Sequence, residues 1–370
     1  MPTKSSKRTV SQGKTSTPQT NTTTAPNTKH PSLSPANITP KIFHDLLALY
    51  PQTVTAVHNR KNTLKLQPKP KTAKRKAEAL DIAPTEPNSS LEETVRSETA
   101  KFIELDTWRY EEMPQTLSKR KSETNGEKGY LDKAELIRIM EWKLCVPSPF
   151  LFLSISFILF PSSRLELDKL LHTKPDRKHG HFRPTLMGMI KSNAEKVVLE
   201  CTSSAISLLP EPSTTPNVDS EGDLYPKESF DALTRLRGVG VATASLILSI
   251  ATASSVEVDE VPFYSDDTFL WLCAGCYPGS EEEEVRKYLK PNGDLGVKYN
   301  VNEYRLLWEK MEELRGRLNR PGEGEDKIRF VDIERVAFVV RNFDDSGFDV
   351  GGDDGGGDEV DEKGVKKVKT

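Results

Sequence analysis

Apolar residues recur at helical spacing through the central part of the chain, from about residue 91 to residue 343. The clearest stripe joins Leu131, Leu136, Ile137, Met140 and Leu144, which fall on one face of a helix. The same spacing predicts further helices at 92–110, 192–208, from 227 through 248, and at 267–273, 302–318 and 332–342. No segment alternates apolar and polar residues as a half-buried strand does. The pattern therefore predicts an all-α domain over 91–343.

The two ends of the chain have a different composition. Residues 1–90 are rich in Ser, Thr, Pro, Asn and Lys, and residues 344–370 are rich in Asp, Glu and Gly. Such segments bury too little apolar surface to fold alone, so we expect a disordered basic arm and a disordered acidic tail. Thr39 and Pro40 begin a short helix at 40–50 within the arm. That helix either docks on a partner or forms only transiently.

The net charge of -3 conceals an uneven distribution of charge along the 370 residues. Basic runs in an accessible, disordered segment are typical of nuclear import signals, and they attract phosphate and acidic partners. We therefore expect a nuclear protein that binds DNA, with chromatin or nuclear protein partners held by the basic arm. The N-terminus lacks the apolar region of a secretory signal, and we expect no membrane association. The basic run comprises Lys69, Lys71, Lys74, Arg75 and Lys76.

The segment at 233–248 predicts a helix, a tight turn and a second helix. Two glycines, Gly238 and Gly240, allow the backbone conformations of a tight turn and the close approach of a ligand. Free N–H groups at the start of the second helix favour a phosphate. The alternative is a packing turn that binds nothing. We predict that DNA backbone is bound by Arg237, Gly238, Val239, Gly240, Val241 and Thr243, with Arg183, Lys191 and Arg235 as candidates for a wider DNA face.

The hairpin sequence resembles that of a known family. Leu-Arg-Gly-Val-Gly-Val-Ala-Thr-Ala at 236–244 resembles the hairpin of the helix-hairpin-helix DNA glycosylases of the endonuclease III group, and 261–267 falls where that group carries its catalytic Asp. The segments 130–144, 179–184 and 191–193 are similar to the nuclear Amun-like proteins, which share this hairpin. The resemblance covers about residues 95–343 and implies a glycosylase-like helical domain.

Two departures from that family limit the chemistry that the resemblance implies. Lyase-type members carry a lysine two residues after the second hairpin glycine, where this chain has Ala242 and therefore no amine. The iron–sulfur members carry four spaced cysteines, where this chain has only Cys273 and Cys276. We therefore expect neither a lyase reaction nor such a cluster, and we predict no metal site and no cofactor.

The remaining catalytic candidate is Asp266, with Asp267 second. Release of a base builds positive charge on the sugar, and a fixed carboxylate stabilises that charge or orients a water. The alternative role of Asp266 is to cap the helix that follows it. Three functions follow: DNA binding without catalysis, which we favour; a monofunctional DNA glycosylase that uses Asp266; and a chromatin-complex scaffold in which the hairpin is only structural.

One segment interrupts the pattern of the Amun-like proteins. In that pattern the helix ending at Leu144 runs almost directly into the stretch that begins at Lys178. Here residues 145–177 intervene, first strongly apolar and then charged. The apolar part is shorter than the ~20 residues of a spanning helix. We expect an unspliced intron read as protein, or an insertion that loops out of the domain with Leu144 and Lys178 close together at its base.

Overall fold

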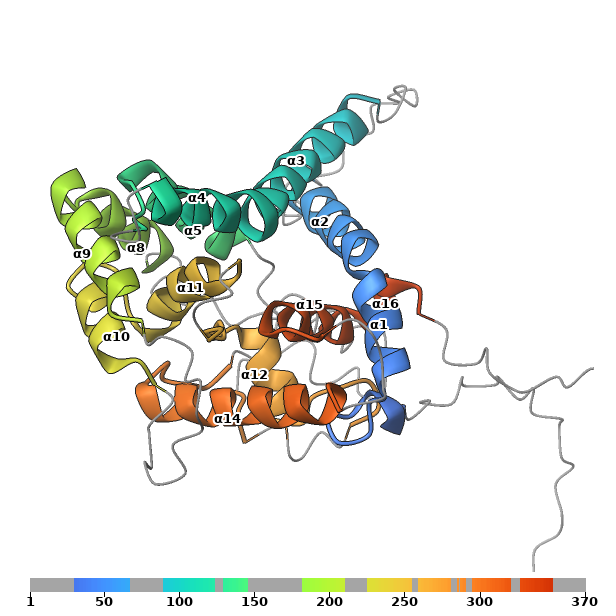
Figure 1. Ribbon diagram of the computed structural model, residues 1–370. Helices are drawn as coiled ribbons and strands as arrows, with labels where there is room; N and C mark the ends of the chain where they lie inside the picture. The colour runs from blue at the N-terminus through green and yellow to red at the C-terminus, as the bar shows by residue number, and fades with distance from the viewer. Residues whose placement is uncertain are drawn as a thin grey trace, which may run out of the picture.

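The structure, a computed structural model, describes residues 30–66, 89–123, 129–145, 182–209, 225–254, 259–280, 285, 287–290, 295–320 and 327–348. Within these ranges the chain forms helices and loops without a strand, and its β pairing is limited to one bridge between Leu289 and Leu295. The fold is all-α, as the apolar spacing predicts (Figure 1). None of the helices in the described ranges is long and apolar enough to cross a membrane.

Most helices in the central part of the chain follow the predicted ranges, with differences of a few residues at their ends, but the helices at 113–123 and 182–191 are not predicted by the apolar spacing. Two elements are single turns of other helix types, a 3-10 turn at η1 and a π-helical turn at η2. In chain order the helices are η1 (Pro31–Leu33), α1 (Pro40–Ala48), α2 (Tyr50–Leu66), α3 (Ser89–Thr107), η2 (Trp108–Glu112), α4 (Met113–Glu123), α5 (Lys133–Cys145), α8 (Phe182–Lys191), α9 (Glu195–Ser207), α10 (Lys227–Thr234), α11 (Val241–Thr252), α12 (Asp266–Leu272), α14 (Val301–Leu318), α15 (Phe330–Arg341) and α16 (Phe343–Ser346).

The N-terminal helices belong to the folded body, which moves the predicted domain boundary at residue 91 toward the N-terminus. The Thr39 side chain caps α1 by accepting a hydrogen bond from the Ile42 N–H at 3.3 Å. Phe43 and Leu46 of α1 are fully buried, and α1 and α2 both contact α15. The helix expected at 40–50 therefore exists, but it is neither isolated nor transient in this structure.

Contacts with the C-terminal half explain why composition misplaces this boundary. Residues 30–66 look polar when taken alone, yet their few apolar side chains find partners far along the chain, and tertiary burial overrides local composition. Residues 1–29, 67–88 and 349–370, which include the predicted import signal and most of the predicted acidic tail, lie outside the described residues. Three long-range hydrogen bonds run from Trp271 Nε1 to the Leu33 carbonyl (2.9 Å), from Arg317 to the Ile38 carbonyl (2.7 Å) and from Gln52 to the Ser346 carbonyl (2.6 Å).

A buried polar network fixes the last turn of α5. The Asp106 carboxylate of α3 accepts hydrogen bonds from the Trp142 indole N–H at 2.7 Å and from the Tyr50 hydroxyl at 3.1 Å. Beside it, the Arg109 guanidinium pairs with Glu334 of α15 at 2.8 Å, and only 2% and 8% of these two side chains are exposed. Buried charges are tolerated when they are paired in this way. The network therefore holds α3, α5 and α15 in one arrangement.

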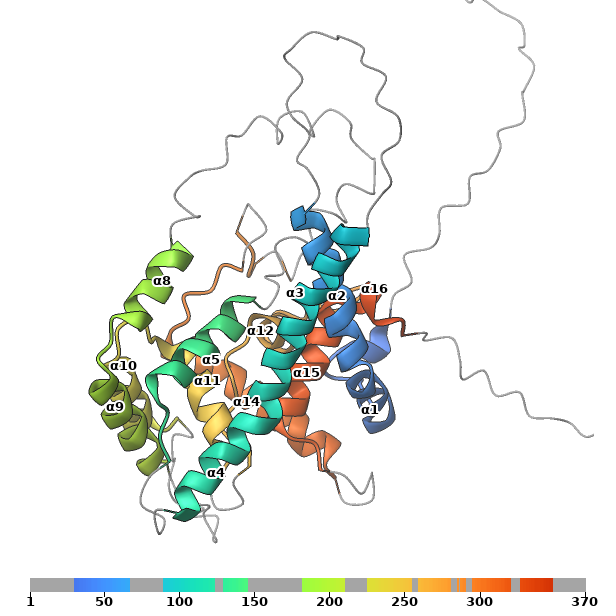
Figure 2. The same ribbon diagram turned by 90° about the horizontal axis from the view of Figure 1, so that it is seen from above.

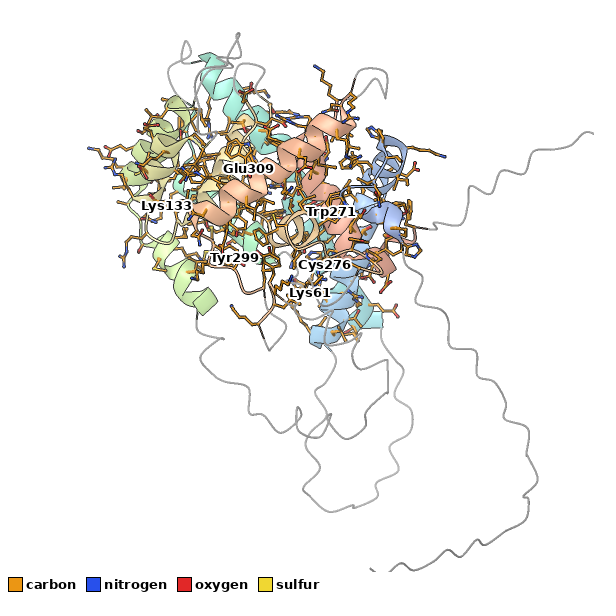
Figure 3. The ribbon with its side chains drawn as sticks, turned by 90° about the horizontal axis from the view of Figure 1, so that it is seen from below. Lys61, Lys133, Trp271, Cys276, Tyr299 and Glu309 are labelled. Carbon is orange, nitrogen blue, oxygen red and sulfur yellow. The ribbon has the colours of Figure 1, made fainter. Side chains whose placement is uncertain are left out.

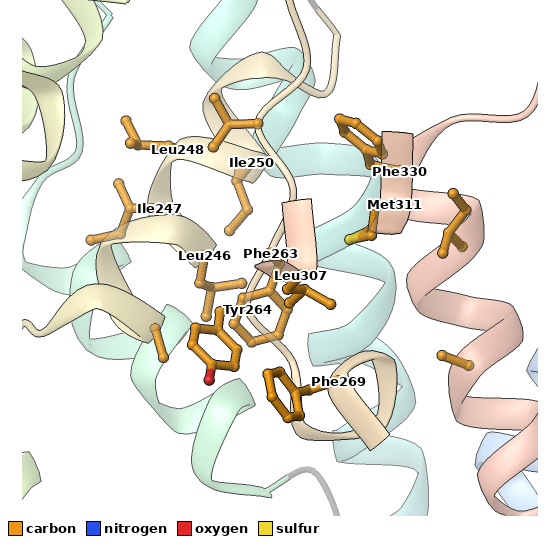
Figure 4. Packing of buried hydrophobic residues seen from close by; sticks show 14 of the residues in the cluster. Leu246, Ile247, Leu248, Ile250, Phe263, Tyr264, Phe269, Leu307, Met311 and Phe330 are labelled. Carbon is orange, nitrogen blue, oxygen red and sulfur yellow. The ribbon is translucent and has the colours of Figure 1, made fainter. Parts of the chain in front are cut away.

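The helix α11 runs through the centre of the apolar core (Figure 4). It is apolar on every side, as a fully buried helix is, and its residues Leu246, Ile247 and Leu248 have no exposed surface. It contacts α4, α9, α10 and α14. Figure 2 shows α9 and α10 at one end of the domain and α1, α2 and α16 at the other. Within α11 only Val241, Ser249 and Ala251 are partly exposed, and Val241 begins the helix directly after the exposed Gly240.

The predicted insertion falls almost wholly outside the described residues. The helix α5 ends at Cys145 and α8 begins at Phe182, and the two helices contact each other. Residues 146–181 lie between them and are not described. The predicted proximity of Leu144 and Lys178 stays a prediction.

Candidate nucleic-acid interface

The turn between α10 and α11 has the geometry that its two glycines predict, but the two glycines have different tasks. Gly238 has a φ of 83°, and a Cβ added there would lie 3.2 Å from the Met189 Cβ and 3.3 Å from the Ile190 side chain. Gly240 has ordinary extended backbone with a φ of -109°, and no atom lies within 4 Å of an added Cβ. Gly238 is therefore required by the fold, whereas Gly240 keeps a surface open.

The open surface at Gly240 exposes the amides that begin α11. Gly240 is the N-cap of this helix and, as a glycine, offers no side chain to its amides. The Gly240 carbonyl accepts hydrogen bonds from the N–H groups of Thr243 and Ala244 at 2.9 and 2.8 Å. Within the described residues, the N–H groups of Gly240, Val241 and Ala242 have no acceptor. A phosphate oxygen would satisfy them and would gain from the helix dipole.

Val239 and Thr243 do not offer their amides to a ligand. The Val239 N–H donates to the Leu236 carbonyl at 3.1 Å, and the Val239 side chain is buried, as expected of the residue between the two glycines. The Thr243 side chain is only 4% exposed, and its N–H is bonded within the turn. Of the six predicted backbone-binding residues, these two therefore support the turn, and a direct phosphate contact from Thr243 is not favoured.

Asn193 holds the hairpin turn in place from outside the hairpin. Its side-chain oxygen accepts a hydrogen bond from the Arg237 N–H at 2.9 Å, and its side-chain nitrogen donates to the Arg237 carbonyl at 3.0 Å. The same nitrogen donates to the Ile190 carbonyl at 3.0 Å. Asn193 is 6% exposed, so this clamp is shielded from water. Sequence reasoning assigned Asn193 no role, and its only signal was its place in the segment 191–193.

Three basic residues lie around the open turn. Arg235 and Arg237 are exposed on the hairpin, and Lys191 is exposed at the end of α8, two residues before the clamp. Exposed arginine and lysine beside free amides suit a phosphate backbone. The structure thus places these three predicted residues close to the hairpin turn and to the end of α8 that packs beside it. The fourth, Arg183, lies at the start of α8, and its side chain is outside the described residues.

Lys143 enters this region from α5, and sequence reasoning missed it. Its Nζ donates to the Thr243 Oγ1 at 3.0 Å, and it lies 5.9 Å from the centre of the Phe263 ring. Burial lowers the pKa of Lys143 to about 8 because it removes water from the ammonium group, while the Asp266 carboxylate acts in the opposite direction. A lysine in the last turn of a helix usually complements the helix dipole. Because this role is common, the sequence alone gives no sign that Lys143 contacts the hairpin.

Asp266 is the first residue of α12, and its half-buried carboxylate faces Tyr299. The Tyr299 hydroxyl donates to the Asp266 Oδ1 at 2.9 Å. Tyr299 lies just before α14 (Figure 3), in the left-handed backbone region with a φ of 54°. That conformation costs of order 1–3 kcal/mol in a residue with a side chain. The alternative role of Asp266 as a cap is wrong, because Ser265 caps α12 by accepting from the Thr268 N–H at 3.0 Å.

Asp267 points into the interior instead. It is 8% exposed, and its Oδ1 has no hydrogen-bond partner within the described residues. Burial raises the pKa of Asp267 to about 7, against the opposing effect of the Arg341 charge. The two adjacent carboxyl groups therefore differ: Asp267 is buried, whereas Asp266 is half-buried and its charge acts on Lys143.

Neither the cysteines nor the one small cavity described below supplies a reactive thiol, a metal site or a pocket for a base within the described residues. Burial raises the pKa of Cys273 to about 12, so its thiol stays protonated. In the described part of the chain, no three His, Cys, Asp or Glu side chains gather as metal ligands do. A cavity of about 20 Å³ is too small for a base, and Asp266 is not among its lining residues. The lining includes Arg109, Tyr110, Ser249, Phe263, Phe330 and Glu334.

Comparisons with protein-family models, with curated proteins and with solved structures give no match to this chain.

Proposed function

We propose that this protein is a nuclear DNA-binding protein that holds a backbone phosphate at the start of α11. The observation that carries the proposal is the pairing of free amides with an open approach: the amides at 240–242 lack acceptors within the described residues, and nothing lies within 4 Å of a Cβ built on Gly240. Arg235, Arg237 and Lys191 supply positive charge around the same place. Contacts of this kind recognise the backbone and carry no sequence information.

The Gly240→Leu variant tests this proposal. The φ of -109° at Gly240 suits any residue, so the variant should fold, at a cost of about 1 kcal/mol for a poorer N-cap. Its side chain would fill the space in front of the amides. We expect duplex DNA to bind at least about tenfold more weakly, for all sequences alike, and the slope of log affinity against log salt to fall by ~1. Fluorescence anisotropy over a range of salt concentrations measures both.

A matched control is the Gly316→Leu variant in α14, because Gly316 also has nothing within 4 Å of an added Cβ. It introduces the same side chain away from the hairpin and should leave DNA affinity unchanged. Equal affinities of wild type and Gly240→Leu would contradict the proposal. Absence of salt-dependent binding by the wild type would instead favour the scaffold role, in which the hairpin serves only packing.

The second candidate function is release of a base by Asp266. The observation that favours it is the placement of Asp266 near the Lys143 ammonium, with the Tyr299 hydroxyl fixing one carboxylate oxygen at 2.9 Å. In this case Asp266→Asn should abolish base release from a panel of damaged duplexes while DNA affinity is retained. Counting abasic products by alkaline cleavage measures the loss. If the wild type releases no base from any substrate, this second function is excluded and backbone binding alone is retained.

A further inference from the structure

Tyr299 has a backbone conformation that the fold does not need from a tyrosine. Its φ of 54° lies in the region that glycine and asparagine adopt easily, and no other residue with a side chain has a positive φ within the described residues. The next residue, Asn300, already caps α14 by accepting a hydrogen bond from the Glu303 N–H at 2.9 Å. A glycine before this cap would be less strained. Residues held in such strain cluster at functional sites, and here the strained residue carries an aromatic ring.

The Tyr299 ring is held in place but is not covered. Its hydroxyl donates to the Asp266 Oδ1 at 2.9 Å, and its centre lies 5.4 Å from that of the Tyr264 ring, at an angle of 49°. Tyr264 in turn stacks on Phe269 (Figure 4) and on Tyr304, with angles of 25° and 19° between the rings. Yet 37% of Tyr299 is exposed. This ring is therefore the outer member of a packed cluster of aromatic rings, and part of it faces solvent.

Two sets of contacts connect the ring to the start of α11. The Tyr264 N–H donates to the Ser245 hydroxyl in α11 at 3.0 Å. Asp266, which accepts from the ring hydroxyl, lies near enough to Lys143 for its charge to act on the ammonium group. That ammonium group donates to a hydroxyl in the first turn of α11 at 3.0 Å. The exposed ring is thus close to the open amides that begin the same helix.

A fixed, exposed aromatic ring beside a phosphate site suits a nucleobase. Every base has an apolar face, so stacking on an aromatic side chain depends little on which base is present. In an intact duplex the base faces are covered by neighbouring base pairs, and a ring that is itself held in place reaches only an unpaired base. Lys298, the exposed residue before the ring, adds positive charge for the backbone of the same strand. These features fit a single strand better than a duplex.

We propose that the Tyr299 ring stacks on an unpaired base of single-stranded DNA while the amides at 240–242 hold a phosphate of the same strand. This inference rests on the proposed function and names the class of DNA that the site prefers. The hydrogen bond to Asp266 and the contact with Tyr264 position the ring before the strand arrives, so binding orders little of this side chain. A single strand should therefore bind more tightly than the same strand annealed to its complement.

Fluorescence anisotropy tests this preference with one labelled strand, measured alone and as a duplex. The Tyr299→Asn variant removes the ring, and asparagine tolerates a positive φ. Its melting temperature should stay within about 4 °C of the wild-type value, because relief of strain offsets the lost contacts. We expect its affinity for the single strand to fall at least about fivefold, with its affinity for the duplex unchanged.

Two further variants separate stacking from a structural role of the tyrosine. Tyr299→Phe keeps the ring and loses only the hydrogen bond to Asp266, so it should bind the single strand within about twofold of the wild type. If the hydrogen bond were the purpose of Tyr299, this variant would be as weak as Tyr299→Asn. The matched control is Leu64→Asn, because Leu64 is 41% exposed on α2, at the other end of the domain from α9 and α10 (Figure 2). It should leave both affinities unchanged.

Photochemical crosslinking uses the unaltered chain and so does not depend on the folding of a variant. A single strand that carries 5-iodouracil is irradiated in complex with the protein, and the attachment site is mapped by mass spectrometry. We expect the crosslink at Tyr299. Absence of a crosslink at this residue overturns the proposal. Equal single-strand affinities of the wild type and Tyr299→Asn, or a wild type that binds the duplex as tightly as the single strand, overturn it as well.

Failure of this inference is distinguishable from failure of the proposed function. If Gly240→Leu weakens DNA binding but the strand preference and the crosslink do not involve Tyr299, only the stacking is refuted and the hairpin proposal stands. If the wild type binds neither the single strand nor the duplex, both are refuted.

Discussion

Replacing Arg109 with methionine is expected to lower the free energy of unfolding by about 3–5 kcal/mol. The guanidinium pairs with Glu334 at 2.8 Å in a place where 2% of Arg109 and 8% of Glu334 are exposed. It also lies 3.9 Å from the centre of the Tyr110 ring and 4.2 Å from that of Trp142. Its removal leaves the Glu334 carboxylate buried, with the Tyr110 hydroxyl at 2.9 Å as its remaining hydrogen-bond donor among the described residues.

Urea denaturation of the full chain measures this loss. Arg138→Met is the matched control, because Arg138 also pairs with a glutamate (Glu104, at 3.3 Å) but has 37% of its side chain exposed. An exposed pair of this kind is worth under about 1 kcal/mol. The double variant Arg109→Met, Glu334→Leu should recover much of the stability, because no charge is left buried alone. If the free energy of unfolding of Arg109→Met lies within about 1 kcal/mol of the wild-type value, the pair of Arg109 and Glu334 does not stabilise the fold as expected.

Gly238→Val is expected to destabilise the domain by about 2–4 kcal/mol, whereas Gly240→Val costs under about 1 kcal/mol. At Gly238 a side chain has to adopt a φ of 83°, which alone costs ~1–2 kcal/mol. Its Cβ would also lie 3.2 Å from the Met189 Cβ, an atom that cannot move without α8, and overpacking of this kind costs ~1–3 kcal/mol. Gly240 meets neither obstacle.

Thermal unfolding followed by circular dichroism compares the two valine variants directly. We expect both variants to lose DNA affinity and only Gly238→Val to have a lowered melting temperature. That result would mean that Gly238 is needed for folding and Gly240 for binding of the ligand. Equal melting temperatures would mean that α8 yields to the new side chain, and the close approach at Gly238 would lose its explanation.

The sequence predicts the parts of this fold that depend on local spacing. The spacing predicts a helix at 302–318, and α14 spans Val301–Leu318. The prediction succeeds because the buried positions of this helix recur at the helical period along its whole length. The hairpin glycines were identified because the turn needs them within one short segment. The ranking of Asp266 above Asp267 as a catalytic candidate stays a prediction, whereas the cap of α12 is Ser265 and not Asp266.

The sequence does not predict contacts between residues that are far apart along the chain. Asn193 and Arg237 are 44 residues apart, and Lys143 and Thr243 are 100 apart. The spacing of apolar residues does not predict such a contact, since neither partner differs from a usual surface residue within its own segment. Tyr299 escapes notice for a related reason: its hydroxyl matters only because α12 and the start of α14 meet. The hairpin part of the candidate site can therefore be predicted from the sequence, whereas the part formed by tertiary contacts cannot.

The hydrogen bonds that attach the N-terminal helices also determine when those helices can be completed during synthesis. The partners of these hydrogen bonds are far apart in the sequence: Leu33 and Trp271 are separated by 238 residues, Ile38 and Arg317 by 279, and Gln52 and Ser346 by 294. A ribosome that adds ~5–20 residues per second needs roughly 15–60 s to cover the longest of these intervals. During that time the apolar faces of α1 and α2 have no partner from the C-terminal half. The helices α1 and α2 thus reach their final contacts only after the C-terminal half has been made, and the nascent chain carries exposed apolar surface until then.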